Sequence, residues 1–242
     1  TAKRYPRNLA KFRQSLMAMA TNDQETAAGM FYVVPRAGKK IEGESIRLAE
    51  IAATCWGNMR YGTRVIETAD RWVTAQGVAY DLENNNWVTV EVRRRITDRT
   101  GRRYDDDMIG VTAQAAMSIA LRNAIFRIIP RVWVREAYLE ARQVAIGKGL
   151  DVETQRKNAL TWFTRIGATE SDLLKLLGRA AWADVTQDDL VDLRGFRSAI
   201  HDGETTWQDV KRGIDAPAGE GTEKAPIDAL ADALRQRREG GA

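Results

Sequence analysis

The spacing of apolar side chains predicts two helices in the first quarter of the chain. Over residues 7–20, apolar side chains recur every three or four positions, which is the period of an amphipathic helix. A second helix is predicted to begin after Ser45, whose hydroxyl suits an N-cap, and to run to about Trp56. Gly57 then stands where a helix-ending glycine is common.

Between these helices, residues 31–34 form a short apolar run that ends at Pro35 and predicts a strand. A basic loop is expected next, containing Lys39 and Lys40. Such a loop is compatible with two interpretations, a phosphate contact or an ordinary solvated turn.

Between Tyr61 and Thr97 the apolar side chains recur at every second position instead of every third or fourth. This segment is rich in Val, Thr, Trp and Tyr, and it is interrupted by Gly62, Gly77 and the turn-forming run 84–86. Together these signals predict a three-stranded antiparallel meander.

The predicted third strand, 87–96, has two different faces, because side chains alternate along a strand. One face is apolar, with Val88, Val90, Val92 and Ile96. The opposite face presents Trp87, Thr89, Glu91, Arg93 and Arg95. Arg94 interrupts the apolar face, so we expect it at the sheet margin or paired. Arg99, Arg102 and Arg103 follow in a turn.

Arginines beside an exposed aromatic ring are typical of surfaces that bind single-stranded nucleic acid. Guanidinium groups neutralise the phosphates, and flat rings stack on bases without reading their identity. The alternative is a strand edge that carries ordinary solvated arginines.

A long helix is predicted over about 106–128, ending before Pro130. Asp105, Asp106 and Asp107 precede or open it, and three adjacent carboxylates raise the possibility of a metal-dependent nuclease. We favour capping, because carboxylates in a first turn complement the helix dipole. No second acidic cluster with a catalytic Lys or His lies nearby.

Small side chains are frequent along this helix, which would allow close approach to a sheet or to a neighbouring subunit. Arg122 lies on a polar stripe with Gln114 and Ser118, Arg127 lies beside that stripe, and Arg131 follows the helix.

Charge divides the 242 residues into unequal parts. Residues 1–150 carry 24 Lys and Arg against 16 Asp and Glu, a net charge of +8, whereas residues 151–242 carry 13 against 17, a net charge of −4. A polyanion is therefore the first partner to expect for the basic part.

Composition also argues against several classes of protein. One cysteine, Cys55, and one histidine, His201, are too few for a zinc or iron–sulfur site, so no metal or cofactor is expected. No phosphate-loop motif or nucleophile elbow occurs. No uninterrupted apolar run approaches the roughly 18 residues of a membrane span, and no secretory signal follows the basic N-terminus. We therefore expect a cytoplasmic protein.

Three segments are predicted: an α+β domain over 1–150, a helical C-terminal module over 151–212, and a flexible linker with a short tail helix over 213–242. In the module, Thr169 with Asp172, and Thr186 with Asp189, have the spacing of N-cap pairs. Gly178 and Gly203 stand at expected helix ends, and His201 is expected in a turn.

The order of these parts resembles the single-strand annealing proteins of phage recombination, over roughly residues 40–145. The resemblance is carried by a helix ending in 56–58 (Trp-Gly-Asn), a meander with Asp81 before its second turn, a basic third strand, and a long helix containing 121–124 (Leu-Arg-Asn-Ala). These proteins include the RecT, Red-beta, Erf and Sak types and share a β-β-β-α core with the eukaryotic Rad annealing mediator.

The resemblance implies an antiparallel meander packed on a long helix, and a protein that is not an enzyme. Such proteins coat single-stranded DNA along a basic groove of a ring or helical homo-oligomer and promote pairing of complementary strands without ATP. The groove candidates are Arg93, Arg95, Arg99, Arg102, Arg103, Arg122, Arg127 and Arg131, to which the sequence adds Trp87, Lys39 and Lys40.

The resemblance also implies partners and a location. The C-terminal module would dock a host single-strand binding protein or a phage exonuclease, or would simply pack on the core, and the location would be the bacterial host cytoplasm. A metal-dependent nuclease using residues 105–107 and a plain single-stranded DNA binding protein remain the alternatives.

Overall fold

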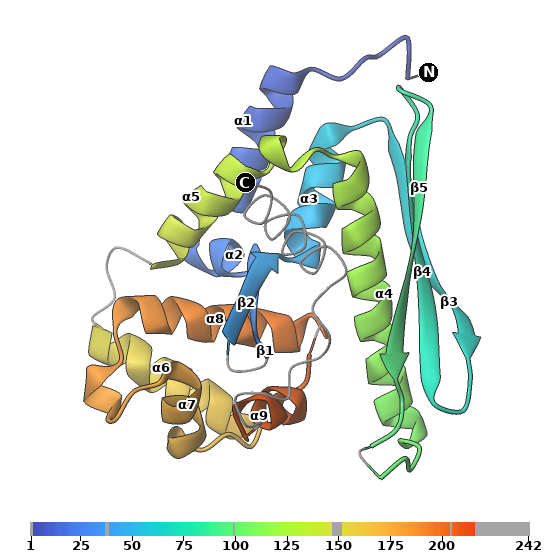
Figure 1. The fold of residues 1–242 in the computed structure, drawn as a ribbon. Coiled ribbons are helices and arrows are strands. Elements are labelled where there is room, and N and C mark those ends of the chain that lie inside the picture. The colour runs from blue at the N-terminus through green and yellow to red at the C-terminus, as the bar shows by residue number, and fades with distance from the viewer. Residues whose placement is uncertain (1, 37–38, 99, 147–151, 204, 216–242) are drawn as a thin grey trace, which may run out of the picture.

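A three-stranded antiparallel sheet and a long helix lying along one of its faces dominate one side of the molecule (Figure 1). The computed structural model describes residues 2–36, 39–98, 100–146, 152–203 and 205–215. The sheet has the order β3 (Met59–Thr68), β4 (Trp72–Asp81) and β5 (Asn86–Arg95), and the helix is α4 (Asp106–Ile128). The predicted meander and long helix are confirmed, and the fold is α+β.

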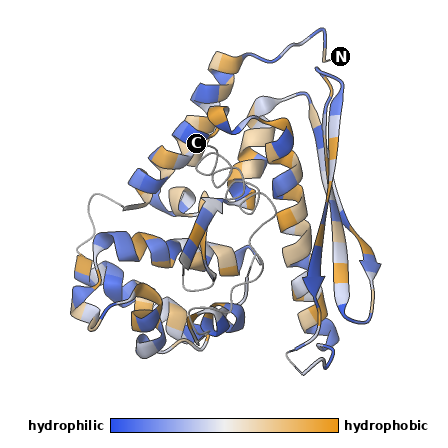
Figure 2. Cartoon of the chain, viewed as in Figure 1, coloured by the Kyte–Doolittle hydropathy of each residue, from blue (hydrophilic) through white to orange (hydrophobic). Residues whose placement is uncertain are grey.

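Alternation along the strands explains why the sheet has a covered face. Val73, Ala75, Ala79 and Val90 are buried on the face toward α4, which we call the inner face. The polar and apolar alternation can be followed in Figure 2. The other face, called the outer face, has no helix against it among the described residues (Figure 1).

Gly77 allows α4 to approach β4 closely. A Cβ atom built on Gly77 would lie 2.3 Å from both the carbonyl carbon and the carbonyl oxygen of Ala120. The helix contributes small buried residues at this contact, including Ala116, Ala120 and Ala124. The small residues of α4 therefore serve contact with the sheet, one of the two roles that the sequence left open.

The N-terminal helices form largely as predicted. α1 (Leu9–Ala20) confirms the helix over 7–20, and α3 (Ile46–Trp56) is capped by Ser45, whose hydroxyl accepts a hydrogen bond from the Leu48 amide at 3.2 Å. Gly57 ends α3 with φ at +67°. A short helix that the periodicity did not predict, α2 (Gln24–Ala28), lies between them.

The basic loop predicted around Lys39 and Lys40 is instead part of a β-hairpin. β1 (Phe31–Arg36) pairs antiparallel with β2 (Lys39–Glu44), so both lysines belong to a strand. The sequence of β2 has little strand preference of its own. Its conformation is supplied by pairing with β1, which in turn packs against α8 (Gln187–His201).

The C-terminal segment contains four α-helices among the described residues: α6 (Val152–Arg165), α7 (Glu170–Leu177), α8 and α9 (Trp207–Asp215). Both predicted N-cap pairs are capping boxes, and Gly178 and Gly203 have positive φ at the ends of helices. His201 is the last residue of α8, so its placement in a turn was wrong. Residues 213–215 belong to α9 and not to the predicted linker, and 216–242 lie outside the described residues.

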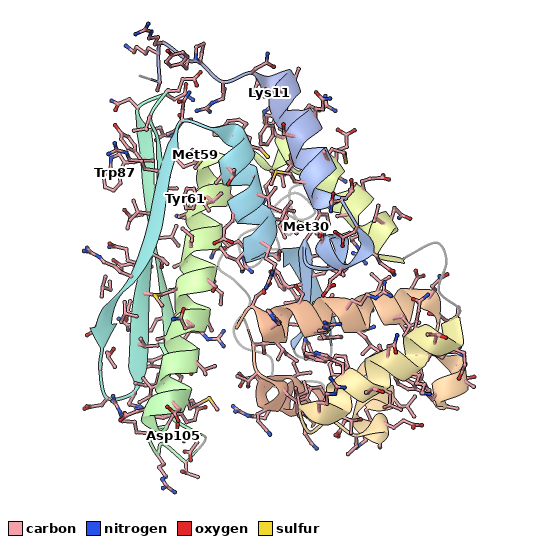
Figure 3. The ribbon with its side chains drawn as sticks, turned by 180° about the vertical axis from the view of Figure 1, so that it is seen from behind. Lys11, Met30, Met59, Tyr61, Trp87 and Asp105 are labelled. Atoms are coloured by element: carbon pink, nitrogen blue, oxygen red, sulfur yellow. The ribbon has the colours of Figure 1, made fainter. Side chains whose placement is uncertain are left out.

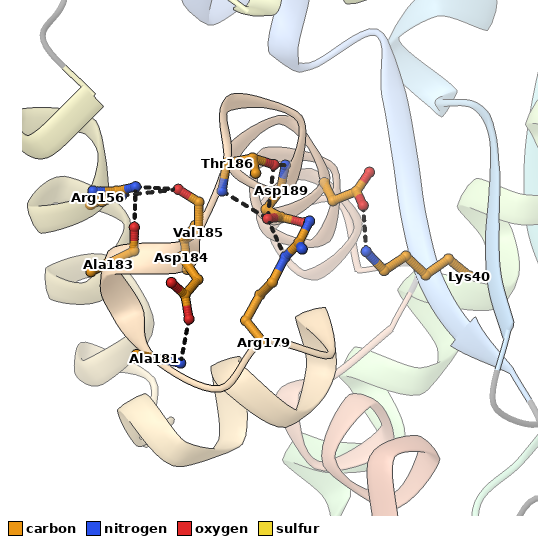
Figure 4. Close-up of polar contacts among 10 residues, drawn as sticks. Lys40, Arg156, Arg179, Ala181, Ala183, Asp184, Val185, Thr186 and Asp189 are labelled. Carbon is orange, nitrogen blue, oxygen red and sulfur yellow. Dashed lines mark hydrogen bonds and ion pairs between the residues drawn. The ribbon is translucent and has the colours of Figure 1, made fainter.

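Polar contacts hold these helices together (Figure 4). The Arg156 guanidinium on α6 donates to the carbonyl oxygen of Ala183, in the short helix η2 (Trp182–Asp184), and to that of Val185, just after this helix. The Arg179 guanidinium donates to the carboxylate of Asp189 at 2.8 Å. Since one arginine ties α6 to η2 and the other ties the end of α7 to α8, the helices form one packed unit.

The C-terminal helices share one hydrophobic core with the N-terminal part of the chain. This cluster includes Phe12 of α1, Phe31 of β1, Phe163 of α6 and Phe196 of α8. A Cβ atom on Gly195 would lie 2.4 Å from Val33 Cγ2, so α8 and β1 are in direct contact. The predicted boundary near residue 150 falls in 147–151, outside the described residues, and the division into domains remains a prediction.

A buried ion pair ties the N-terminal segment to the end of β4. The Arg7 guanidinium donates to both carboxylate oxygens of Asp81, at 2.8 and 2.5 Å, and lies 4.4 Å from the ring centroid of Trp56. Burial alone would raise the pKa of the Asp81 carboxyl, but hydrogen bonds from Arg7 and Asn84 outweigh burial and hold that pKa below its usual 3.8.

We expect this pair to make stability depend on acid pH. A carboxylate whose folded pKa is depressed contributes stability above its unfolded pKa, and that contribution is lost as the pH falls through the folded pKa. Between pH 5 and pH 3 the wild type should lose about 1 kcal/mol more than Asp81→Asn. Urea unfolding at several pH values measures this difference, and parallel curves for the two proteins would contradict the assignment.

α4 has the length and the apolar composition of a helix that could cross a membrane, and 44% of its most apolar 18-residue stretch is buried in the structure. α4 packs along the sheet, and a core helix can share these two properties with a membrane span. Length and composition therefore carry no conclusion about where the protein resides.

Candidate nucleic-acid interface

The outer face of the sheet carries rows of side chains, one from each strand, set by the strand register. At one end, Arg60 of β3, Tyr80 of β4 and Trp87 of β5 form a row. Trp87 is 64% exposed. Figure 3 shows Trp87 on the side of the sheet away from α4. Two aromatic rings and a guanidinium group therefore lie in line across this end of the outer face.

A second pairing of arginine with an aromatic ring lies at the opposite end. Trp72, the first residue of β4, is the register partner of Arg95 on β5. The Arg95 guanidinium carbon lies 5.2 Å from the centroid of the Trp72 ring, within the range of a cation–π interaction. This contact holds the arginine against the sheet, with its charge at the surface.

Three rows lie between these ends: the first is Gly62–Val78–Thr89, and the next two are polar. Arg64 donates from Nη2 to the side-chain oxygen of Gln76 at 3.3 Å, and Glu91 completes that row. In the next row Thr74 donates to the Glu67 carboxylate at 3.2 Å and lies beside Arg93. Arg64, Glu67, Glu91 and Arg93 all have exposed side chains.

The outer face carries an excess of positive charge. Four arginines of the rows, Arg60, Arg64, Arg93 and Arg95, stand against two glutamates, Glu67 and Glu91. The face thus combines positive charge with the exposed ring of Trp87 and the half-buried rings of Tyr80 and Trp72. Positive charge and aromatic rings are the two features that single-strand binding surfaces use.

Three of the predicted site residues lie on this face: Trp87, Arg93 and Arg95. Arg94 is on the inner side, opposite Val73, and is half-buried. The side chains of the third strand therefore point to the faces that were predicted for them. The participation of these residues in binding remains a prediction.

The turn after β5 is organised by Asp98. Its carboxylate accepts hydrogen bonds from the hydroxyl and amide of Thr100 and from the amide of Arg102, and these bonds lower the pKa of the Asp98 carboxyl. Arg102 is exposed. The Arg103 guanidinium donates to the carbonyl oxygen of Ala69 at 2.9 Å, which ties this turn to the turn between β3 and β4. Arg99 lies outside the described residues.

Arg122 does not share a surface with Arg93 and Arg95 within the chain, and its contact with DNA remains a prediction. It is only 9% exposed, and its guanidinium carbon lies 4.6 Å from the ring centroid of Tyr32 on β1. The helical periodicity placed it on a polar stripe, but packing of the hairpin against α4 buries that position. Arg122 therefore joins α4 to the hairpin.

The remaining basic candidates also lie away from the outer face. Arg127 is an exposed residue of α4, which packs on the inner face. Arg131 lies 3.8 Å from the carboxylate of Glu44 on β2. The Lys40 ammonium lies 2.5 Å from the carboxylate of Asp192 on α8, a contact drawn in Figure 4, and the side chain of Lys39 is outside the described part. Among the described residues, Arg127, Arg131 and Lys40 therefore do not share the outer face with Arg93 and Arg95, and their part in binding remains a prediction.

Four residues of the rows escaped the sequence analysis: Arg60, Arg64, Trp72 and Tyr80. The face on which they lie could have been predicted by pairing the third strand with its neighbours across the two turns and continuing the alternation of faces along each strand. A β-bulge between Val65 and Glu67 complicates this for β3, because the extra residue shifts every later side chain to the other face.

The acidic run at the start of α4 serves as a cap. Asp105 is the N-cap residue, and its carboxylate accepts a hydrogen bond from the Met108 amide at 2.8 Å. Asp106 and Asp107 lie exposed in the first turn. In the described part of the chain, no three His, Cys, Asp or Glu side chains are grouped as metal ligands would be.

Comparison of the chain with protein-family models, with curated proteins and with solved structures finds no match.

Proposed function

We propose that this protein binds single-stranded DNA along the outer face of the β3–β4–β5 sheet. The observation that carries the proposal is the coincidence of Trp87, Tyr80 and Arg60 in one row of the outer face with a further arginine–tryptophan pair at the far end. Phosphates would be neutralised by guanidinium groups, and bases would stack on the exposed rings. No covalent bond is made or broken.

The proposed role of this binding is to anneal complementary strands without ATP, as part of homologous recombination of the phage type. The support is the resemblance of residues 40–145 to phage annealing proteins, together with the β-β-β-α order of the elements. A base that stacks on a ring through its flat face keeps its hydrogen-bonding edge free for pairing. Assembly of several copies as a ring or filament would hold a longer strand open.

Two further features belong to the same proposal. The C-terminal helices would contact a host single-strand binding protein or a phage exonuclease, and the protein would act in the bacterial cytoplasm. The alternative functions are a plain single-strand binding protein and a metal-dependent nuclease. Capping of α4 by Asp105 gives the acidic run a structural role and removes the main reason to propose a nuclease.

One assay separates the three functions. Two complementary labelled oligonucleotides are mixed with the protein in EDTA and without ATP, and duplex formation is followed by fluorescence. We expect pairing faster than in buffer alone. Slower pairing would identify a plain binding protein. In a second arm of the assay, with magnesium in place of EDTA, degradation of the labelled strands that disappears in Asp107→Ala would identify a nuclease. No binding to either strand, measured by fluorescence anisotropy, would refute the proposal.

A further inference from the structure

The β3–β4–β5 sheet ends in two unpaired strands of equal length. Within the described residues, β3 and β5 each have ten residues and pair only with β4. Both are antiparallel to β4, so they run parallel to each other. Long unpaired edges expose backbone donors and acceptors, and soluble proteins usually cover or pair them.

β3 is the less protected of the two edges. Every residue of β3 except Met59 is exposed. Tyr61 and Val65 point to the inner face yet are 40% and 37% exposed, because α4 lies mainly against β4 and β5. Figure 3 shows Tyr61 near this uncovered margin. The free edge of β3 and the uncovered part of the inner face beside it together leave apolar surface that a partner can bury.

We propose that the partner is a second copy of this chain, whose β5 pairs in parallel with β3 and continues the sheet. The argument is charge complementarity along the rows. Each row except Trp72–Arg95 has one end on β3 and the other on β5. A neighbour placed in the same register therefore sets the β5 end of its row beside the β3 end of the same row in this copy.

All three rows that carry a charge on β3 find a complement in this arrangement. Arg64 meets Glu91 of the second copy, and Glu67 meets Arg93 of the second copy. Arg60 meets Trp87, a cation beside a ring. Opposite charges on neighbouring strands stabilise their pairing, whereas like charges oppose it.

The contact is heterologous, because different strands of the two copies meet. Such contacts repeat and produce a closed ring or an open filament, in contrast to a symmetric contact that stops at a dimer. Each copy would add its arginines and rings to one continuous outer face. This inference deepens the proposed function, on which its connection to DNA rests, but the assembly itself is tested without DNA.

The test uses two variants that preserve the net charge. Arg64→Glu with Glu67→Arg reverses the β3 edge, and Glu91→Arg with Arg93→Glu reverses the β5 edge. Each variant alone should associate about tenfold or more weakly than wild type, because its remaining wild-type edge meets like charges. Mixed in equal amounts, the two should assemble again, because each altered edge then finds its complement.

Sedimentation velocity over a wide range of protein concentration gives the result, and circular dichroism on heating confirms that each variant is folded. A wild type that stays monomeric, that stops at a dimer, or that assembles no better than either variant would overturn the inference, as would a mixture that fails to assemble. DNA binding of the wild type is measured separately by fluorescence anisotropy. Assembly without DNA binding would refute the proposed function alone, and binding without assembly would refute this inference alone.

Discussion

Replacing both Arg93 and Arg95 by alanine is expected to weaken single-stranded DNA binding about thirtyfold near physiological salt and to flatten its salt dependence. Each phosphate that is no longer neutralised lowers the slope of log K against log salt concentration by about 0.7, so two such phosphates lower it by about 1.4. Fluorescence anisotropy with a labelled oligonucleotide, repeated across a salt titration, measures both quantities. A double variant with the wild-type slope would remove these residues from the interface.

Three other variants show whether the weaker binding comes from charge at this face. Arg135→Ala removes an exposed arginine from α5 (Arg135–Ile146), away from the sheet, and should leave the affinity nearly unchanged. Trp87→Ala should weaken binding about tenfold, the scale of one stacked base, without changing the slope. Trp87→Phe should retain most of the affinity because a ring remains. A large slope change in Trp87→Ala would indicate disturbed charge and not the absence of stacking.

The second large effect concerns folding, at the contact between α4 and β4. Gly77→Ala is expected to lower the free energy of unfolding by about 3 kcal/mol. The added methyl group would lie 2.3 Å from backbone atoms of Ala120, and a helix backbone cannot rotate away as a side chain can. Urea denaturation measures the decrease, and a variant within about 0.5 kcal/mol of wild type would contradict the close packing.

Gly62→Ala is the matched control. Gly62 is also a strand glycine, but it lies on the exposed edge strand β3, and a Cβ atom there would meet nothing within 4 Å. Alanine restricts the unfolded chain more than glycine does, so this variant should be as stable as wild type or slightly more stable. An equal decrease in both variants would show that the cost comes from glycine replacement in strands and not from the helix contact.

Local signals in the sequence were sufficient for the main elements. Ser45 and Gly57 mark the ends of α3 through a side-chain cap and a positive φ, and both act over a few residues of chain. The alternation in β5 gave the correct face to Trp87, since the period of a strand depends only on its own backbone. The capping role of Asp105 was likewise predictable from its place before an apolar helix.

The position of Arg122 depended on packing that no local pattern contains. The helical period correctly put it in line with Gln114 and Ser118 on α4, but Arg122 itself is buried, with the ring of Tyr32 from the β1–β2 hairpin against its guanidinium group. The strand β2 itself was missed, because its pairing partner and its support on α8 come from other parts of the chain.

The sequence by itself determined the meander and the main helices, several of their caps, and the side chains that share a face of β5. These features follow from backbone periodicity and from hydrogen bonds between near neighbours. Only the tertiary structure decided which strands lie together and which arginines reach a common surface. Register joined Arg60 and Tyr80 to Trp87, and close packing at Gly77 placed α4 on the opposite side of the sheet. Both depend on contacts between residues distant in the chain, which a single sequence does not specify one by one.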